Sequence, residues 1–509
     1  MKKPFAEIRD RLPQPVCDEH PEFTELYWAA WKLAYDHVRH IPGMPQDPYM
    51  DEAFCDSDIW IWDTCFMSLF CKFAPQELFP GSGSLQNFYH VLYDHGTLPE
   101  ITYENVPEWT GCKPGDCGRI QIHIADNPPL FAWAEYENAL FTGDTAHIRE
   151  LLLEKQYLQK HYDFIENLTE PVTPLGVRNV TCLLKRPLGY LWEGGRSGMD
   201  NTPRGRTGEH AEKDRPNNPD LLWVDAICQQ ALSAYCIARM AEWIGETGMA
   251  AVWQKKYEEK QDTVRQYYWD VRDQVFYDID QNIHDFCRVL TPASFWPLTA
   301  HLADEQQARG MARTVEDSRK LGGRYPWVTL SRDDADFNAA DGHYWRGSVW
   351  LPTAYAGLRG CVNYGYYDLA RETGIRLIDQ MYRTWKDFEP HTIWECYAPN
   401  ACEPAHGCGP HPDLVRPNFC GWSALGPIAV YLEFVIGIYS VNAFTRQVKW
   451  HLPAERRGKT GVRNLQFADI TADLIAEKDK ITVRSSGEFE LEINGRKYSV
   501  PAGTSVFSS

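Results

Sequence analysis

Hydrophobic residues recur at helical spacing through most of the chain between residues 20 and 440. One such face is formed by Leu221, Val224, Cys228, Leu232 and Tyr235. Residues at this spacing share one side of an α-helix, so the pattern indicates amphipathic helices. It predicts about twelve helices, at residues 22–39, 62–73, 82–95, 127–141, 145–166, 220–243, 247–269, 292–302, 304–319, 347–360, 363–385 and 421–440.

Several long loops separate these helices, which come in pairs. The loops are rich in Trp, Gly, Pro and acidic residues, and they cover residues 41–61, 96–126, 167–219, 320–346 and 387–420. Loops of this length within a compact domain usually carry function. Helices paired in six hairpins would close into a double ring. We therefore expect an all-α fold, an (α/α)6 toroid, in which the long loops surround a central pocket.

The C-terminal segment follows a different pattern, in which hydrophobic and polar residues alternate. Alternation is typical of β-strands, and Asn494-Gly495 between two such runs is a signal for a type I′ hairpin turn. The change of pattern predicts two domains, the helical toroid over residues 1–445 and a small β-rich module over residues 446–509.

Composition limits the partners that we expect. The 51 basic and 70 acidic residues give a net charge of −19, which argues against nucleic acid and anionic membranes, because both attract positive charge. The N-terminal segment lacks the apolar core of a secretory signal, and no apolar run reaches the length of about 18 residues that spans a membrane. With fifteen cysteines, which fit a reducing compartment, these features predict a cytoplasmic protein.

Aromatic residues make up 13% of the chain, and 19 of them are Trp. Tryptophan in this abundance suits flat, amphipathic ligands such as sugars, although large helical cores also contain it.

One group of metal-ligand residue types stands in the segment CEPAHGCGPH. It comprises Cys402, His406, Cys408 and His411. Their spacings match no standard zinc template. We therefore expect a loop with scattered thiols and no metal site.

Two acidic residues occupy long loops of unusual composition. Asp200 lies among glycines in WEGGRSGMDNTPR, and Glu395 lies in HTIWECYAPN. Taken alone, either could be an ordinary surface charge. In a closed toroid, however, both loops would lie at the same opening of the central pocket. Hydrolysis of a glycosidic bond uses two such carboxyl groups, one that protonates the leaving oxygen and one that activates water or attacks the sugar. Aromatic neighbours would raise the pKa of the acid by excluding water.

The surrounding segments resemble motifs of glycoside hydrolase family 63, which includes processing α-glucosidases and mannosylglycerate hydrolases, and of the related trehalases. GMDNTPR resembles the family segment whose aspartate is the general acid, which implies that role for Asp200. WECYAPN resembles the segment that carries the general base, which implies that role for Glu395. Trp62 and Asp63, in IWIWDTCFMSLF, match the Trp-Asp pair that holds the terminal sugar.

Further matches follow in the order of the family. YWRGSVWLPTAY is similar to Tyr-Trp-Arg-Gly-Pro-x-Trp, and FCGWSALGP is similar to Phe-x-Gly-Trp-Ser. The resemblance covers residues 55–435 and implies the (α/α)6 fold and inversion of anomeric configuration. Arg204 would either anchor its loop or contact a sugar hydroxyl. We assign substrate binding to Trp62, Asp63, Asn127, Trp192, Gly198, Arg204, Tyr344, Trp345, Arg346, Trp350, Trp394 and Trp422.

The chain departs from the family pattern around the expected sugar subsites. Ser348 replaces a proline, the segment 126–129 stands where Gln-Pro-Pro is common, and Glu100 stands where Asn is frequent. These departures leave glucose, mannose or galactose open as the terminal sugar. The large insertion of the bigger α-glucosidases is absent, which indicates a compact enzyme for short substrates.

The matches predict an inverting α-glycosidase that removes terminal α-linked sugars, of the glucose or mannose type, from short oligosaccharides or small glycosides without a cofactor. Asp200 would protonate the leaving group while Glu395 deprotonates the attacking water, across a gap of about 6.5–9.5 Å. Two alternatives remain open. A sugar phosphorylase on the same toroid needs no general base, so Glu395 argues against it. An inert carbohydrate-binding protein would bind sugar without turnover.

Overall fold

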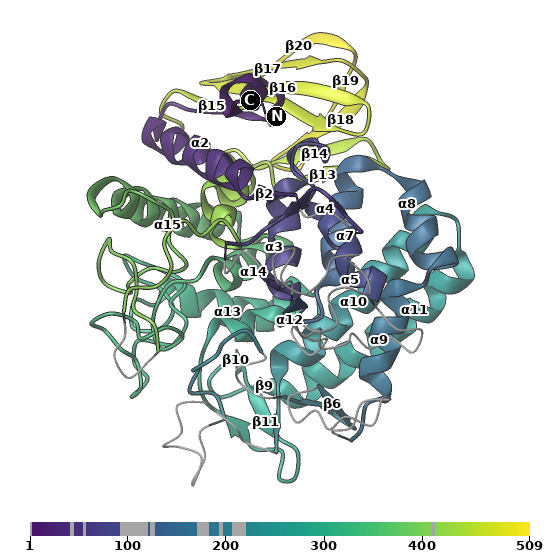
Figure 1. The fold of residues 1–509 in the computed structure, drawn as a ribbon, viewed down its shortest axis with the longest axis vertical. Helices are drawn as coiled ribbons and strands as arrows, with labels where there is room; N and C mark the ends of the chain where they lie inside the picture. Colours follow the sequence, from purple (N-terminus) through teal and green to yellow (C-terminus); the bar gives the residue numbers. More distant parts are fainter. Residues whose placement is uncertain are drawn as a thin grey trace.

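The computed structural model describes residues 3–40, 45–53, 58–91, 121–122, 128–170, 183–192, 197–205, 220–408 and 413–508. Within these ranges the chain up to residue 438 is mainly helical, and the remainder is built from β-strands. Figure 1 shows the β-strands of the C-terminal part at one end of the molecule, above the helices.

Six helical segments contact one another in a closed ring within the described residues. Each contacts the next along the chain, and the last returns to the first. Every residue of the first segment is buried, as expected for a helix that is apolar on all sides. The segments are α3 (Ile61–Cys71), α7 (Phe131–Thr142), α10 (Val224–Trp243), α12 (Trp296–Thr299) with the 3-10 turn before it (Pro292–Phe295), α14 (Leu351–Asn363) and the π-helical η8 (Gly426–Val435).

Amphipathic helices cover the outside of this ring. α15 (Tyr367–Asp387) packs on η8, both α9 (Tyr157–Asn167) and α11 (Thr247–Thr263) pack on α10, and α2 (Pro21–Asp36) packs on η8 and α15. In α15 the buried residues recur at helical spacing and the charged residues lie on the other face. The outer helices therefore show the periodicity from which they were predicted, while the ring helices are buried on nearly every side.

All the predicted helices fall on helical segments, but those expected at 247–269, 292–302 and 421–440 change helix type along their length, and two others are broken into shorter helices. The helix expected at 145–166 consists of α8 (Thr145–Arg149), a π-helical turn (Glu150–Glu154) and α9, with Gln156 in the left-handed region at φ 56°. The helix expected at 82–95 consists of α4 (Gly81–Ser84) and α5 (Gln86–Val91) in its described part. Hydrophobic spacing misses such breaks because one left-handed residue barely changes the spacing of its neighbours.

A five-stranded sheet that the sequence did not predict lies at the end of the ring opposite the C-terminal strands (Figure 1). Its strands contain two or three residues each, which is too short for an alternating pattern to be recognised. The sheet brings the segment before α10 next to the segment that leads to Asp200. Its order is β12 (Phe286–Cys287), β11 (Asp278–Asp280), β8 (Leu221–Leu222), β7 (Gly189–Leu191) and β6 (Leu184–Arg186).

The C-terminal strands form two sheets. One has the order β13 (Ser440–Asn442), β14 (Gln447–Trp450), β18 (Phe489–Ile493), β19 (Arg496–Val500), and the other has β1 (Gln14–Cys17), β15 (Lys459–Phe467), β16 (Ile470–Glu477), β17 (Lys480–Ser485), β20 (Gly503–Ser508). The predicted hairpin turn at Asn494-Gly495 is confirmed, since it joins β18 to β19 with both residues at positive φ. Strand β1 joins the second sheet, so residues outside 446–509 also build it.

The helices in the described part of the chain include none that is long and apolar enough to cross a membrane.

Candidate active site

Glu395 lies in the extended segment after α15 and is 1% exposed. Its backbone carbonyl accepts hydrogen bonds from Trp422 Nε1 at 2.9 Å and from Ser423 Oγ at 3.0 Å. Its carboxylate accepts hydrogen bonds from the Tyr344 hydroxyl at 2.8 Å and the Arg416 backbone amide at 3.2 Å. The Arg416 guanidinium lies 3.4 Å from the same carboxylate. Burial raises the pKa of Glu395, and these donors oppose the increase, so the carboxylate is held in place by groups that favour its ionised form.

Asp63 is the third residue of α3 and is 4% exposed. Its Oδ1 atom has no hydrogen-bond partner among the described residues. Burial raises the pKa of Asp63 well above its ordinary value, and the negative charges of Glu395 and Asp200 raise it further. The charges of Glu395 and Asp200 therefore both reach Asp63, although the three residues come from distant parts of the sequence.

Asp200 is half-buried and lies in the described loop 197–205. Two residues before it, Gly198 adopts φ +83°, and a Cβ atom there would lie 3.2 Å from the Trp62 ring. The backbone of this loop therefore passes directly over the indole, an approach that suits glycine. The charge of Asp200 also raises the pKa of Tyr344, after burial and Glu395. These effects bring Asp200 to the same site as Asp63 and Glu395.

Asn201 joins the Asp200 loop to the segment that carries Tyr344. Its side-chain amide donates to the backbone carbonyl of His343 at 2.8 Å and accepts from the backbone amide of Trp345 at 2.8 Å. Arg346 Nε donates to the backbone carbonyl of Asn201 at 3.1 Å. Two of the long loops are thus tied together immediately beside Asp200.

Arg204 anchors the other end of the Asp200 loop, which is one of the two roles expected for it. The side chain is 1% exposed, and every guanidinium nitrogen is engaged, mainly by Asp225 at the start of α10 and Asp278 in β11 at 2.6–2.8 Å. The guanidinium also lies over the Trp223 ring at 4.3 Å. These contacts support anchoring and leave no N–H of this side chain for a substrate.

Tyr344 is held by an unusual backbone. Gly342, His343 and Tyr344 have φ of +81°, +35° and +65°, and positive values are unfavourable for the two residues that carry a Cβ atom. The Tyr344 carbonyl accepts hydrogen bonds from Trp350 Nε1 at 3.1 Å and from the Ser348 hydroxyl. Ser348, which stands where the family has proline, therefore stabilises the turn that directs Tyr344 toward Glu395.

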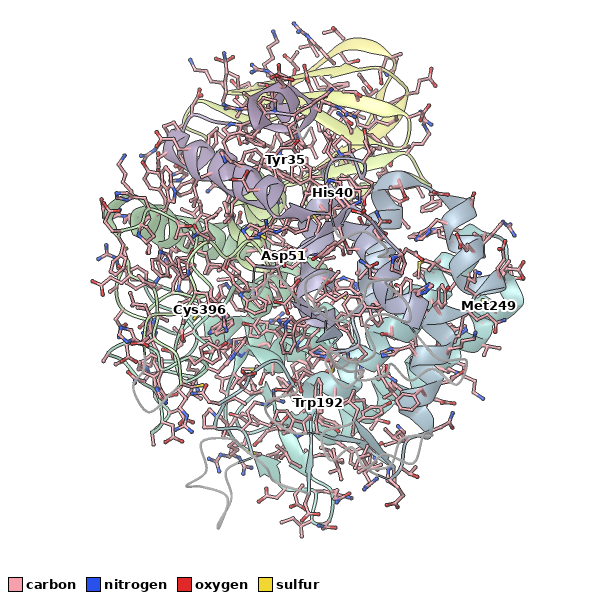
Figure 2. All side chains as sticks on the ribbon, in the orientation of Figure 1. Tyr35, His40, Asp51, Trp192, Met249 and Cys396 are labelled. Carbon is pink, nitrogen blue, oxygen red and sulfur yellow. The ribbon has the colours of Figure 1, made fainter. Side chains whose placement is uncertain are left out.

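The tryptophans expected at the site are buried. Trp345 and Trp350 stack at 4.0 Å and are each 1% exposed, and Trp350 packs against Trp422 at 5.3 Å. Trp62, Trp192 and Trp394 are 3–5% exposed. In Figure 2, Trp192 lies in the half of the molecule away from the C-terminal strands. Trp422 and Trp350 donate hydrogen bonds to the backbone carbonyls of Glu395 and Tyr344, and contact of the tryptophans with substrate stays a prediction.

Several predicted residues lie outside the described residues. They include Asn127, and also Glu100 and Asp126 from the departures noted above. Of the cysteine and histidine cluster, His411 lies outside as well. Among the described residues, no group of three Asp, Glu, His or Cys side chains has the arrangement of a metal site.

Two residues of this site were missed by sequence reasoning. Asn201 directly follows Asp200, and a polar residue beside a candidate acid was the available signal. Arg416 follows Glu395 by 21 positions, and nothing in the sequence indicates that its loop returns to that carboxylate.

The model of the mannosylglycerate hydrolase MGH1-like glycoside hydrolase domain matches residues 60–411, a range that contains Asp63, Asp200 and Glu395. A Borreliella burgdorferi protein described as uncharacterized is 22% identical over 423 residues, which are 82% of this chain and 79% of that protein. The mannosyl-oligosaccharide glucosidase of Saccharomyces cerevisiae is 25% identical over 250 residues, which are 45% of this chain and 27% of the glucosidase.

Solved structures show a similar fold. A glycoside hydrolase family 63 mannosylglycerate hydrolase from Thermus thermophilus, in complex with glucose, superposes with a TM-score of 0.55 at 17% identity, over 79% of this chain and 98% of that chain. A protein described as a sialidase superposes with a TM-score of 0.68 at 13% identity, over 99% of this chain. This chain spans 41% of the sialidase chain and 27% of the glucosidase, so it corresponds to a part of those proteins.

Proposed function

The chain belongs to the family of mannosylglycerate hydrolase MGH1-like glycoside hydrolases, and we propose that it is an inverting α-glycosidase. As a member of that family it is a glycoside hydrolase. Its proposed substrates are short oligosaccharides or small glycosides with a terminal α-linked sugar of the glucose or mannose type. We infer a cytoplasmic location and a small carbohydrate as its partner, with no nucleic acid or membrane involved.

The observation that carries this proposal is that Asp200 and Glu395, from two distant loops, both act on the buried Asp63 and on Tyr344. The charges of Asp200 and Glu395 both raise the pKa of Asp63 and of Tyr344. Carboxyl groups that share a site and differ in burial and hydrogen bonding are the requirement for acid and base to act on one glycosidic bond.

Asp200 is assigned the role of general acid. Its proton passes to the glycosidic oxygen as the bond from that oxygen to the anomeric carbon breaks. Glu395 accepts a proton from a water molecule whose oxygen attacks the anomeric carbon from the opposite face. Donors at Tyr344 and Arg416 favour the ionised form that a base requires. Asp63 Oδ1, which has no hydrogen-bond partner in the described part of the chain, is available to accept a hydrogen bond from a sugar hydroxyl.

The (α/α)6 toroid is proposed as the architecture. Its support is the closed ring of six helical segments within the described residues, with amphipathic helices packed outside it. Asp63 and Trp350 lie at the starts of ring segments, and Ser423 lies in the 3-10 turn (Ser423–Leu425) that leads into η8. The proposed active site therefore lies at the N-terminal ends of the ring.

The test measures turnover of defined substrates and identifies the anomer of the product that is released first. Wild type, Asp200→Asn and Glu395→Gln are incubated with α-linked disaccharides, trehalose and α-mannosylglycerate, and the products are followed by NMR. We expect a β-anomer to appear first with at least one substrate, and both substitutions to lower kcat by about 10²–10⁴-fold. Release of the α-anomer would refute inversion. Turnover that depends on inorganic phosphate would favour a phosphorylase.

A further inference from the structure

A cavity of about 400 Å³ lies on the other side of the ring from the candidate active site. Its walls come from the ring segments α7, α10 and α14 and from the C-terminal strands β13, β14 and β18. We call it the distal chamber, and define it by Tyr136, Tyr235, His301, Arg359, Ser440 and Lys449. Its volume falls within the range of about 300–1,000 Å³ that small-molecule sites occupy.

A layer of aromatic rings separates the distal chamber from the candidate active site. The Trp133 ring contacts Phe66, Trp296 and Tyr355, with ring centroids 5.8–6.2 Å apart, and each of the four comes from a different ring segment. Along α14, Arg359 in the chamber lies nine residues after Trp350 at the active site, or about 14 Å along the helix. The chamber is therefore a separate space.

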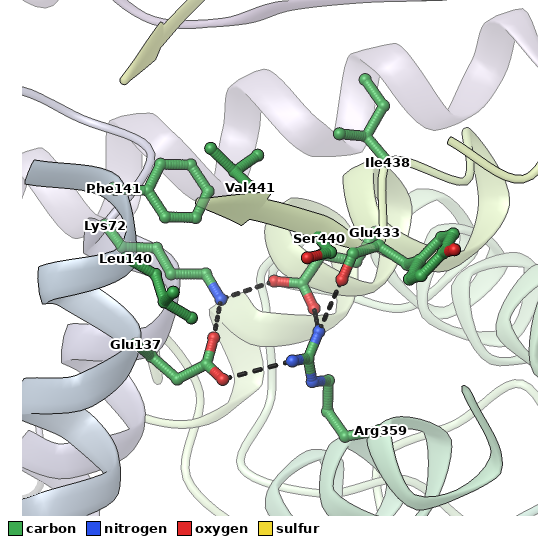
Figure 3. A pocket seen from close by; sticks show the side chains of 10 residues that line it. Lys72, Glu137, Leu140, Phe141, Arg359, Glu433, Ile438, Ser440 and Val441 are labelled. Atoms are coloured by element: carbon green, nitrogen blue, oxygen red, sulfur yellow. Dashed lines mark hydrogen bonds and ion pairs between the residues drawn. The ribbon is translucent and has the colours of Figure 1, made fainter. Parts of the chain in front are cut away.

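The charged residues around the chamber are paired with one another. Arg359 bonds to Glu137 at 3.2 Å and Glu433 at 3.3 Å, and Lys72 bonds to the same two carboxylates at 2.8 Å each. Figure 3 shows this closed set of four charges beside Ser440, in a smaller neighbouring pocket that shares Glu137 and Arg359 with the chamber. A charged ligand would have to compete with an existing ion pair and lose its hydration, so the lining favours a neutral ligand.

On the opposite wall, Lys449 lies 3.8 Å from Glu492. This second pair also leaves the wall without net charge.

Aromatic rings and hydrogen-bonding groups share the remaining surface. Tyr136 and Tyr235 meet edge to face at 6.2 Å, and Tyr136 stacks on Trp243 at 5.1 Å. Tyr235 also packs against His301 at 5.3 Å. Burial and Arg359 lower the pKa of His301 to about 4, so its imidazole is neutral near pH 7 and offers both a donor and an acceptor. Rings beside neutral hydrogen-bonding groups suit a ligand with an apolar face and several hydroxyls.

We propose that the distal chamber is a second binding site that takes a neutral monosaccharide. It would hold its ligand without reaction, because the aromatic layer keeps it apart from Asp200 and Glu395. This inference does not depend on the proposed glycosidase activity, since an inactive protein would have the same chamber.

Crystals of the full chain soaked in D-glucose provide the main test. Ser440→Trp places an indole in the chamber, and Thr445→Trp is the matched control because Thr445 is exposed on the turn between β13 and β14. We expect density for the sugar in the chamber of wild type and Thr445→Trp and none in Ser440→Trp, with similar melting temperatures. A wild-type chamber that holds only water at saturating glucose would overturn the proposal.

Two further measurements do not rely on the bulky variant. Tyr235→Phe removes one hydroxyl from the chamber, and we expect glucose affinity there, measured by calorimetry, to fall about 3- to 10-fold. Unchanged affinity would count against the site. D-glucuronate has the same ring with a carboxylate, and we expect it to bind at least about 10-fold more weakly than glucose. Equal or tighter binding of glucuronate would contradict a neutral ligand.

Discussion

Burial raises the pKa of Glu395, and the hydrogen bond from Tyr344, together with the larger effect of Arg416, opposes the increase. The hydroxyl stabilises the ionised form and so lowers the pKa of Glu395, against the effect of burial. Tyr344→Phe should therefore raise that pKa. If Glu395 is the base, the acid limb of the kcat/KM profile moves to higher pH by about 0.5–1 unit, and kcat falls about 10-fold.

Tyr325→Phe is the control for this change. Tyr325 is also buried, but its hydroxyl contacts the thiol of Cys402 at 3.4 Å and not Glu395. Its profile should match that of wild type. If the acid limb of Tyr344→Phe lies at the same pH as that of wild type, the Tyr344 hydroxyl does not affect the pKa of Glu395.

Gly198 combines a left-handed backbone with a close approach to Trp62. Gly198→Ala should lower the free energy of unfolding by about 1–2 kcal/mol. Because the new Cβ would lie 3.2 Å from the indole, kcat/KM should also fall, by about 10-fold. Gly245→Ala is the control, because Gly245 has a similar left-handed backbone at φ +82°, but a Cβ atom there would meet no atom within 4 Å among the described residues. We therefore expect Gly245→Ala to lower the free energy of unfolding and to leave kcat/KM unchanged. Equal kcat/KM in the two variants would show that the close approach of Gly198 to Trp62 does not matter for activity.

The residues of the site differ in how far the sequence could reveal them. Asp63, Asp200 and Glu395 stand in recognisable motifs, and in the structure the charges of Glu395 and Asp200 both raise the pKa of Asp63. Arg416 and Asn201 make their contacts only because their loops fold back beside the site, and a sequence motif does not show such contacts. Arg204 was recognisable as a position of the motif, but its two buried partners become visible only when α10 and β11 are packed together.

Among the elements, the loop of residues 197–205 depends on the start of α10 for its position. Arg204→Gln would leave Asp225 and Asp278 buried without their cation, and we expect a loss of about 3–5 kcal/mol in the free energy of unfolding, measured with urea. The control is Arg319→Gln, which breaks an exposed pair with Asp317 and should leave stability unchanged. A similar, small effect in both variants would contradict the anchoring role of Arg204.

Helices were predicted more completely than strands because length decides how much periodicity a segment displays. α15 repeats its buried positions over 21 residues, so its pattern is clear. β7 and β8 contain three and two residues. β7 pairs with its neighbour β6, but its pairing with β8 and that of β8 with β11 join strands distant in sequence. Such pairing depends on tertiary contacts and leaves no local signal.

At the scale of the whole molecule, four buried charges link α3, α7, α14 and η8. Burial alone raises the pKa of Glu137, but Arg359 and Lys72 outweigh it and lower the pKa to about 2. A carboxyl group whose pKa is lowered by folding stabilises the protein above its ordinary pKa near 4.5, and that contribution disappears as the pH falls toward 2. Glu137→Gln should thus cost about 3 kcal/mol at pH 7, and the difference from wild type should shrink below about pH 4.5.

Urea unfolding at several pH values between about 3 and 7 measures this difference. Glu490→Gln serves as the control, because Glu490 pairs with Lys497 on the surface, and its stability should follow that of wild type throughout. A difference for Glu137→Gln that stayed constant with pH would show that the ion pairs are not its cause.

The pairing of β1 with β15 has a consequence for how the protein is made. Gln14 lies opposite Arg463, so the first strand leaves the ribosome about 450 residues ahead of its partner. At about 5–20 residues per second, it waits roughly 20–90 s with its backbone edge exposed. During translation this edge is a natural target for a chaperone, and the sheet can be completed only after the last of its strands, β20, has been made.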